Sequence, residues 1–399
     1  MSDELLALIF IHLPVFILMR LRCVSKQFRD LIDNPYFANV HLRHSVRNHL
    51  NRNILCRSMD PDLNCKSVGL HCVEIDTLRC FEPKCPGGRY NSSTQLIGMC
   101  NDIVLFYDQC IKEITFWNPA IRTYIDVILP RVSIPQGSFY NHTYNNLGFG
   151  YDHVNDHYKV VMTVQWYRTT RSNGAQNDKE VHVYSLKSNS WRRIGNFPYS
   201  VNYGRLPATF ANGALFWMCS EETVESNHGK YIAAFELATE EYRVVPALPA
   251  YDDTSCNVDN YIGSMEGFLC VQCYVYHPEC DDELAEMGDI WLLQRDGEED
   301  TWTKLVSFNR PSTVYQPLAF SKSGNHLLLA SQEIFLWYDL VKEEVREEFR
   351  IRGLPQYYEL VAFIESLVHL DGGTSAEENQ LIREKKVAED DESDEGNAA

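Results

Sequence analysis

The chain has 399 residues, of which 45% are hydrophobic and 12% aromatic, a composition that excludes a mostly disordered protein. This length allows one large core or two domains. The formal net charge of −19 argues against a nucleic-acid backbone as the main partner, because phosphates would be repelled. The same charge is compatible with a basic protein target, or simply with solubility.

The charge is spread unevenly along the chain. Residues 1–57 hold eight Lys or Arg against four Asp or Glu, whereas residues 371–399 hold three against ten. The thirteen cysteines are an odd number, and the apolar run Leu5–Met19 lacks the basic opening of a signal peptide. That run has about 15 residues, fewer than the roughly 20 that a membrane span needs. We therefore expect reduced thiols, no membrane insertion and a cytoplasmic or nuclear location.

The first forty residues predict three short helices. In the first, Leu5, Leu8 and Ile9 recur at helical spacing. Pro14 is well suited to open the second, since a backbone N–H is not needed there, and Pro35 ends the third. Helices this short cannot bury much surface alone, and the first two are apolar nearly all round. Part of this surface must be covered, either by the following domain or by another protein.

Three consecutive segments, His12–Val15, Leu18–Arg29 and Leu31–Phe37, stand in one register that resembles the F-box of plant proteins. The resemblance implies that a Skp-type adaptor docks on the apolar helical surface and links the chain to a cullin ubiquitin ligase. The adaptor-binding residues that it implies are Leu5, Leu8, Ile9, Leu13, Pro14, Val15, Leu18, Leu21 and Val24.

Three departures from the family pattern keep another interpretation open. The family opens with a Leu-Pro pair where this chain has Met1, its usual polar pair after Pro-Val is replaced by Phe16-Ile17, and its usual Trp is replaced by Phe28. In the alternative, the helices form a cap that packs only on the chain's own C-terminal domain, and adaptor docking has been lost.

After Arg57 the helical period gives way to short β-rich runs separated by turn residues. The runs recur as five larger units, whose last strands start at positions 124, 191, 242, 302 and 345. Such a period suits the blades of a kelch-like β-propeller. A sixth blade would combine strands near Ser67–Ile75 and Leu360–Val368, which closes the ring and removes exposed edges. An irregular β-sandwich would show similar local patterns.

The predicted fold class is therefore α+β and multidomain. Its parts are a three-helix F-box at 1–42, a linker at 43–64, an all-β propeller of about six blades at 65–370 and a disordered acidic tail at 371–399.

The middle of the chain extends the resemblance. The matching segments are Trp117–Arg122, Leu147–Asp152, Tyr158–Val161, Val183–Leu186 with Trp191, Ile290–Leu293 with Trp302, and Tyr338–Leu340. They are similar to the F-box-associated domain of plants, in an arrangement that resembles S-locus F-box proteins. This resemblance implies recognition of basic style ribonucleases in self-incompatibility, although relatives with this domain also serve immunity or hormone turnover.

Two groups of cysteines have metal-like spacing. Cys270, Cys273, His277 and Cys280 have zinc-ligand chemistry, but strand positions three apart point to opposite faces, which favours packed cysteines. Cys65, Cys72, Cys80 and Cys85 form a looser set. The chain has no P-loop, no GxSxG and no HExxH, so we expect no catalytic residue, metal or cofactor. An enzyme without a local motif is the alternative.

Polar insertions are the best candidates for target contact, namely Arg131–Asn146, Tyr167–Glu180 and Tyr251–Asn260. The residues that we expect to contact the target are Tyr140, Trp166, Tyr167, Arg168 and Tyr251. Most of the seven tryptophans should instead lie in the core. The sequence thus predicts a non-catalytic receptor that brings a target to a ubiquitin ligase, with a non-ligase β-propeller interaction module as the alternative.

Overall fold

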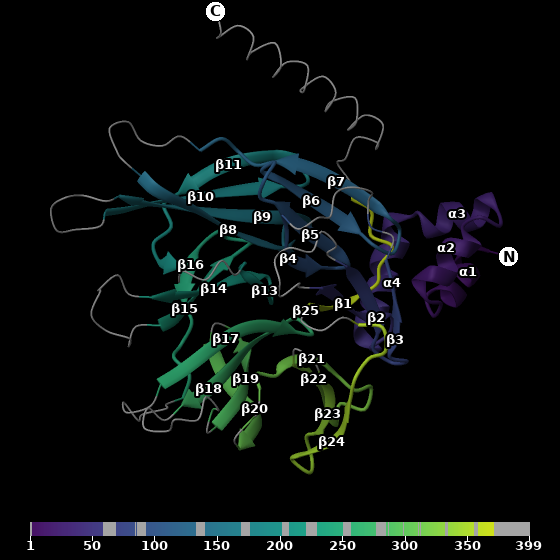
Figure 1. Ribbon diagram of the computed structural model, residues 1–399. Coiled ribbons are helices and arrows are strands. Elements are labelled where there is room, and N and C mark those ends of the chain that lie inside the picture. The colour runs from purple at the N-terminus through teal and green to yellow at the C-terminus, as the bar shows by residue number, and fades with distance from the viewer. Residues whose placement is uncertain are drawn as a thin grey trace, which may run out of the picture.

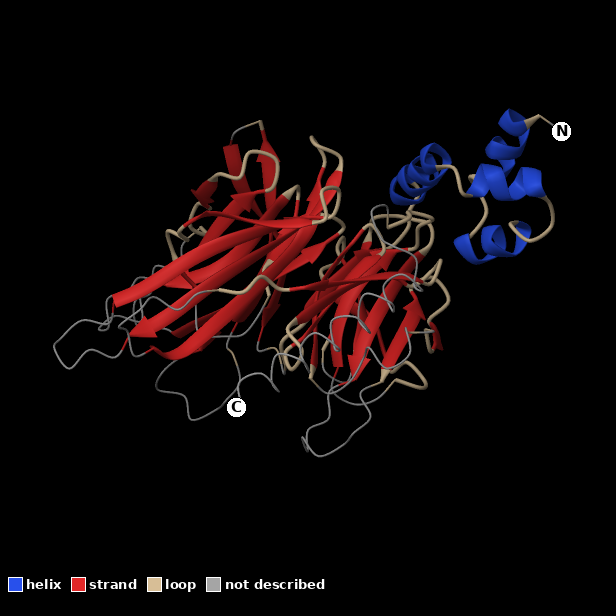
Figure 2. Ribbon diagram, turned by 90° about the horizontal axis from the view of Figure 1, so that it is seen from above, coloured by secondary structure: helices blue, strands red, loops and turns tan. Residues whose placement is uncertain are grey.

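The computed structural model describes residues 2–58, 69–83, 85, 93–132, 140–168, 176–201, 207–220, 230–249, 257–276, 285, 287–297, 299–309, 311, 313–331, 334–354 and 358–370. A group of four helices stands beside a ring of β-sheets, as Figure 1 shows. Figure 2 shows the same helices gathered beyond one end of the β-structure. Among the described residues, no helix is both long and apolar enough to cross a membrane.

The helices are α1 (Asp3–Phe10), α2 (Val15–Leu21), α3 (Lys26–Ile32) and α4 (Pro35–Arg47). Their starts follow the capping rules: the side chain of Ser25 accepts a bond from the N–H of Phe28, and that of Asn34 from the N–H of Tyr36. Pro35 occupies the first turn of α4, where its missing N–H leaves no bond unmade. The Asn34-Pro35 pair therefore ends one helix and begins another.

The strands form six antiparallel sheets. The first two are β4 (Thr94–Cys100), β5 (Ile103–Asp108), β6 (Glu113–Asn118), β7 (Thr123–Ile128), and β8 (Tyr140–Asp152), β9 (His157–Arg168), β10 (Gln176–Ser185), β11 (Ser190–Gly195). The third is β12 (Ser200–Val201) and β13 (Thr209–Ala211), both paired with β14 (Ala214–Ser220), then β15 (Lys230–Glu236) and β16 (Tyr242–Val244). The fourth is β17 (Asn257–Met265), β18 (Phe268–Tyr276), β19 (Met287–Asp296) and β20 (Glu299–Asn309), and the fifth is β21 (Gln316–Phe320), β22 (His326–Ala330), β23 (Phe335–Asp339) and β24 (Glu344–Phe349).

The sixth sheet closes the ring by joining the two ends of the β-domain. Its order is β25 (Tyr358–Ile364), β1 (Arg52–Ser58), β2 (Leu70–Glu74) and β3 (Arg79–Phe81). The first strands of the sheets contact one another in a circle: β4, β8, β13, β17, β21 and β25, then β4 again. The molecule is thus a six-bladed propeller, which removes open inner edges. The predicted fold class and blade number are confirmed.

Side chains between neighbouring blades make the core. Phe116 from the first blade packs against Phe149 and Tyr184 of the second, with ring centroids 5.6 and 5.9 Å apart. Two outer tryptophans also bridge blades. The indole N–H of Trp191 donates to the carbonyl of Ile128 at 3.1 Å, and that of Trp302 to the carbonyl of Pro246 at 2.9 Å. Each ties the last strand of one blade to the end of the preceding blade.

The predicted linker at 43–64 needs correction. Its first residues complete α4, and Arg52–Ser58 forms β1, the second strand of the closing blade. Ile54, Leu55 and Cys56 have no exposed surface, because β1 is flanked by β25 and β2 and covered on both faces. A short strand buried on both faces lacks the alternation that marks a half-exposed strand.

Candidate functional site

The outer face of α1 is an exposed apolar surface. Leu5, Leu8 and Ile9 keep 55%, 67% and 51% of their surface exposed, while Leu6 and Phe10 turn inward. Positions 5, 8 and 9 share one helix face, so the three side chains form a continuous stripe. Val24, in the turn between α2 and α3, is 67% exposed. An exposed apolar stripe of this kind is unfavourable in water and is typical of a surface that a partner covers.

The other predicted adaptor residues lie deeper. Leu13, Pro14 and Leu21 are half-buried, whereas Val15 and Leu18 have no exposed surface and pack in the core of the helices. In this conformation Val15 and Leu18 offer a partner no atoms, so they stabilise the helical domain and are no part of its surface. They are buried because one face of α2 turns into the core that it shares with α3 and α4.

Sequence reasoning missed Phe16 as an exposed apolar residue. It is 56% exposed on α2, and the guanidinium of Arg20, one turn later, lies 5.9 Å from the ring centroid. The signal was present, because Phe16 stands where the family pattern has a polar residue. It adds an exposed apolar side chain on α2 to those of α1 and to Val24.

A buried histidine holds the helices together. The ring Nε2–H of His41 on α4 donates to the carbonyl of Leu13 at 2.9 Å, and the side chain has no exposed surface. Burial lowers the pKa of His41 below its usual 6.5, an effect that the nearby His44 reinforces and the bond to Leu13 opposes. The fold therefore requires the neutral ring.

Acid is expected to weaken the helical domain through His41. Because the folded pKa is lowered, stability is complete above about pH 6.5 and falls below it, by at most about 1.4 kcal/mol for each pH unit. Urea unfolding followed through helical circular dichroism between pH 7.5 and 5 measures the slope. His41→Gln keeps a donor toward Leu13 without titrating and should flatten the slope, whereas His153→Gln, exposed on the propeller, should not. An equal slope in all three proteins would contradict the assignment.

A short segment joins the helices to the propeller. We call Glu365–Leu370, which follows β25, the strap. Leu367 is 1% exposed and packs in the helical core, next to Ala120 and Ile121 from the turn after β6. The helical domain therefore rests on the strap and on one propeller turn.

Hydrogen bonds fasten the strap to the first blade. The N–H of Ser366 donates to Oδ2 of Asp102 at 2.9 Å, and its hydroxyl donates to the carbonyl of Asn101 at 2.9 Å. The side-chain amide of Asn118 donates to the carbonyl of Val368 at 2.9 Å. Burial raises the pKa of Asp102 well above its usual range and that of Glu365 to about 7. These shifted carboxyls serve the junction between the two domains.

The predicted target residues lie at the other end of the second blade. Tyr140 lies where β8 begins and Trp166–Arg168 where β9 ends. Tyr140 is opposite Arg168, His142 opposite Tyr167 and Thr143 opposite Trp166. The opposite ends of these strands, near Tyr151 and His157, line a cavity together with α4. This part of the hairpin therefore points to the propeller face away from the helices. Tyr251 lies outside the described residues, as do parts of all three predicted target-binding insertions.

The metal-like cysteines are packed as small apolar side chains. Cys270 belongs to the core between the fourth and fifth blades, and Cys273 to the core between the third and fourth. The two thiols lie on opposite faces of β18, as their spacing predicts. Burial raises the pKa of both, that of Cys273 to about 12. His277, Cys280 and Cys65 lie outside the described residues, and the described ones contain no group of three metal ligands.

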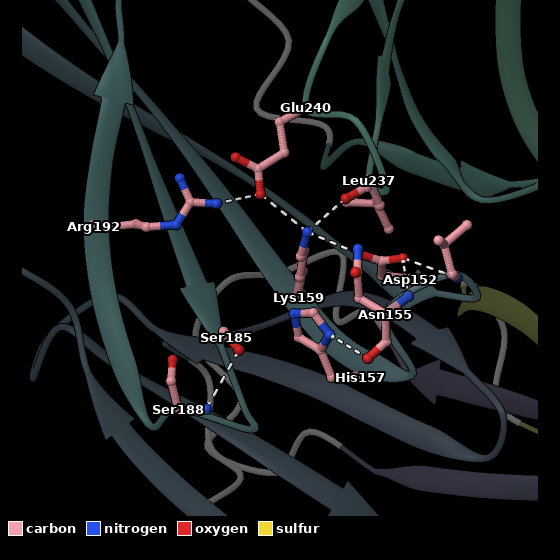
Figure 3. A network of polar contacts seen from close by, with 10 residues as sticks. Asp152, Asn155, His157, Lys159, Ser185, Ser188, Arg192, Leu237 and Glu240 are labelled. Carbon is pink, nitrogen blue, oxygen red and sulfur yellow. Dashed lines mark hydrogen bonds and ion pairs between the residues drawn. The ribbon is translucent and has the colours of Figure 1, made fainter.

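A buried ion network joins the second and third blades (Figure 3). Nζ of Lys159 on β9 lies 2.9 Å from Oδ2 of Asp152 and 3.0 Å from Oε1 of Glu240, and donates to the carbonyl of Leu237 at 2.6 Å. Arg192 also pairs with Glu240. Despite burial, bonds from Asn155 and Lys159 lower the pKa of Asp152 to about 2, and Arg192 and Lys159 lower that of Glu240. The arrangement fits a structural clamp, because each charge is already compensated.

Comparison with known proteins matches both domains. Residues 1–39 match the family described as F-box domain, and residues 77–359 the family described as F-box associated beta propeller domain. The chain is 28% identical over 386 residues to the F-box protein CPR1 of Arabidopsis thaliana, covering 90% of this chain and 86% of that protein. It is 26% identical over 337 residues to the F-box/kelch-repeat protein At3g23880 of Arabidopsis thaliana, covering 80% and 82%.

Proposed function

Because the chain belongs to the F-box proteins that carry an F-box-associated β-propeller domain, we propose that it is the substrate-recognition subunit of a Skp–cullin–F-box ubiquitin ligase. The observation that carries the proposal is the exposed stripe of Leu5, Leu8 and Ile9 on α1, within the F-box match. A Skp-type adaptor would cover this stripe and so remove apolar surface from water.

The proposed mechanism is proximity. The helices hold the ligase while the propeller holds the target, so that a charged ubiquitin carrier meets a lysine of the target at high effective concentration. The propeller face away from α4 is the face that we assign to the target, because there the target and the adaptor do not compete for the same surface. The chain itself forms or breaks no bond in this mechanism.

The target that we propose is a basic protein. The net charge of −19 supports this, since opposite charge steers association and repels wrong partners. Style ribonucleases of the S-locus type are one such class and stay a prediction, as does a cytoplasmic or nuclear location.

Disrupting the stripe is expected to abolish adaptor binding. Leu8→Asp with Ile9→Asp places two charges in the contact, and we expect at least a hundredfold loss of affinity, about 3 kcal/mol or more. Copurification with a plant Skp-type adaptor, followed by calorimetry, measures it. Val341→Asp is the matched control, because Val341 is an exposed apolar residue, 75% exposed, on the turn between β23 and β24.

Two results of this experiment would overturn the proposal. One is a folded parent chain that forms no adaptor complex, which would favour a non-ligase interaction module. The other is a complex that survives the double substitution while circular dichroism shows intact helices, which would place the adaptor elsewhere on the chain.

An enzyme is the remaining alternative, and the described carboxyls give it little support. Asp102 and Glu365 have raised pKa values, as catalytic acids often do. Oδ2 of Asp102, however, accepts the N–H of Ser366, and Glu365 stands in the strap. Both shifts are explained by burial at the junction between the domains.

A further inference from the structure

A large cavity lies between α4 and the propeller. Its volume is about 1110 Å³, and its lining draws on α4, on the strap and on all six blades. It opens at the propeller face where two-residue turns of positive φ end the inner strands, among them Asn101-Asp102, Asn212-Gly213 and Glu266-Gly267. Figure 1 shows α4 between the other helices and the propeller. The volume lies just above the range of roughly 300–1,000 Å³ that is usual for small-molecule sites.

The floor of this cavity is apolar. It includes Met99, Phe210, Leu318 and Phe363, which come from four different inner strands. Met99 and Phe210 are partly exposed, whereas Leu318 and Phe363, only 1% and 8% exposed, offer the cavity little surface. Apolar side chains arriving from several blades would contact the body of a small organic molecule on several sides.

The rim of the cavity is cationic. Arg43 and Arg47 project from α4, and Lys187 from the turn between β10 and β11, all three exposed. Within the described part of the chain, none of them has an ion-pair or hydrogen-bond partner for its side chain. A guanidinium presents a planar fork that matches a carboxylate, sulfonate or phosphate. Three uncompensated cations at one opening are notable in a chain of net charge −19.

The acidic groups of the lining do not neutralise this rim. Glu266 is engaged with Arg52 and His49, at 3.4 and 3.7 Å. Asp156 accepts the hydroxyl of Tyr151. Asp102 is fully buried beneath the cavity, and its neutral form is favoured there. Asp156 keeps its charge, because a hydroxyl donor does not neutralise a carboxylate, so three cations stand against one carboxylate and the opening keeps a net positive charge.

We propose that this cavity binds a small organic anion, with its apolar body on the floor formed by the inner strands and its acidic group between Arg43, Arg47 and Lys187. Such a ligand would touch both α4 and the propeller, and so would stiffen the junction between the ligase-binding and target-binding parts of the chain. The inference does not depend on adaptor docking, because the stripe on α1 lies outside the cavity lining.

The probe for a test is 1-anilinonaphthalene-8-sulfonate, an aromatic sulfonate that fluoresces in apolar sites. The full-length chain is expected to bind one probe molecule saturably. Arg43→Ala with Arg47→Ala should weaken this binding at least tenfold, and Lys187→Ala, on the opposite wall, at least threefold. N-phenyl-1-naphthylamine, which shares the rings but has no sulfonate, should bind parent and variants equally, because only the charge has been removed.

The matched control is Arg79→Ala with Arg352→Ala, two exposed arginines outside the cavity lining. It should leave the affinity for the sulfonate unchanged, and thermal melts should coincide for all variants. Unsaturable binding, or an equal loss in the cavity and control variants, would overturn the proposal.

The acidic tail is the other source from which an anionic group could reach the cavity, since it continues the chain just beyond His369, which lines the cavity. A full-length variant in which the run 389–395 carries Gln and Asn in place of Glu and Asp tests this source. If only that variant binds the sulfonate, the tail fills the cavity and the small-molecule proposal fails. Equal binding by parent and variant supports it.

Discussion

Lys159→Met is expected to destabilise the propeller by about 3–5 kcal/mol. The side chain of Lys159 is 5% exposed, that of Asp152 is fully buried and that of Glu240 is 18% exposed. Removing the ammonium leaves two carboxylates close together with Arg192 as the one remaining cation of this network, and the carbonyl of Leu237 loses its donor. Methionine fills nearly the same volume, so the loss reports the charge rather than a cavity. Urea unfolding followed through tryptophan fluorescence at pH 7 measures it.

The pH dependence of the unfolding free energy distinguishes the loss of this charge from a nonspecific loss of packing. In the parent the pKa of Asp152 is lowered to about 2, so its contribution is present above about pH 4 and is lost as the pH falls toward 2. The stability gap between parent and Lys159→Met should therefore narrow below pH 4. Asp152→Asn added to Lys159→Met should recover part of the loss, because it removes one uncompensated charge.

Lys322→Met is the matched control for that experiment. Lys322 lies 2.9 Å from Asp76, the same distance as Lys159 from Asp152, but its side chain is 55% exposed. A solvated pair of this kind contributes about 0–1 kcal/mol. Equal effects of the two substitutions would show that burial does not decide the strength of the network.

The repeat-level features of the fold could be predicted because each depends on neighbouring residues. Asp152 and Asp339 each end a strand. The side chain of each accepts hydrogen bonds from the backbone N–H groups two and three positions further along the chain, as it does from Val341 and Lys342 at Asp339, at 3.0 and 3.1 Å. Such turns separate one strand from the next, so they mark the strand boundaries in the sequence. The opposite faces of Cys270 and Cys273 follow in the same way from strand alternation.

What escaped prediction depends on partners far apart in the chain. Nothing near Lys159 indicates that Glu240 will approach it from the next blade. β1 pairs with β2 on one side, but on the other side it pairs with β25, about three hundred residues later. The fourth helix was missed for a different reason. Asn34-Pro35 was interpreted only as a stop, although an Asn cap followed by Pro at the first turn also starts a helix.

The candidate adaptor surface was predicted in part. The spacing of the apolar residues predicts α1 and identifies Leu5, Leu8 and Ile9 as members of one helix face. Periodicity does not say which side of a short apolar helix is covered by its neighbours. Val15 and Leu18 turn inward because α2 packs against α3 in a core shared with α1 and α4, a set of tertiary contacts that the local sequence does not specify.

Leu367→Ala is expected to loosen the helical domain from the propeller. The side chain is 1% exposed within the helical core, so its truncation should cost about 2–5 kcal/mol. The propeller should keep its stability, because Leu367 lies beyond β25 and takes no part in the closing sheet. Hydrogen exchange measures the two domains separately: amides of α1–α3 should exchange at least tenfold faster, and those of β1 and β25 at the parent rate.

Val341→Ala, on an exposed propeller turn, controls for substitution as such and should leave both domains unchanged. Adaptor affinity gives the second readout. Leu367 lies in the core and Leu8 on the outer face of α1, so Leu367→Ala should bind the adaptor within about threefold of the parent while target ubiquitination falls. Such a split would follow from the proximity mechanism, in which the strap sets the distance and angle between ligase and target. Faster exchange in β25 would instead mean that Leu367 supports the ring itself, and that the strap and the closing blade act as one unit.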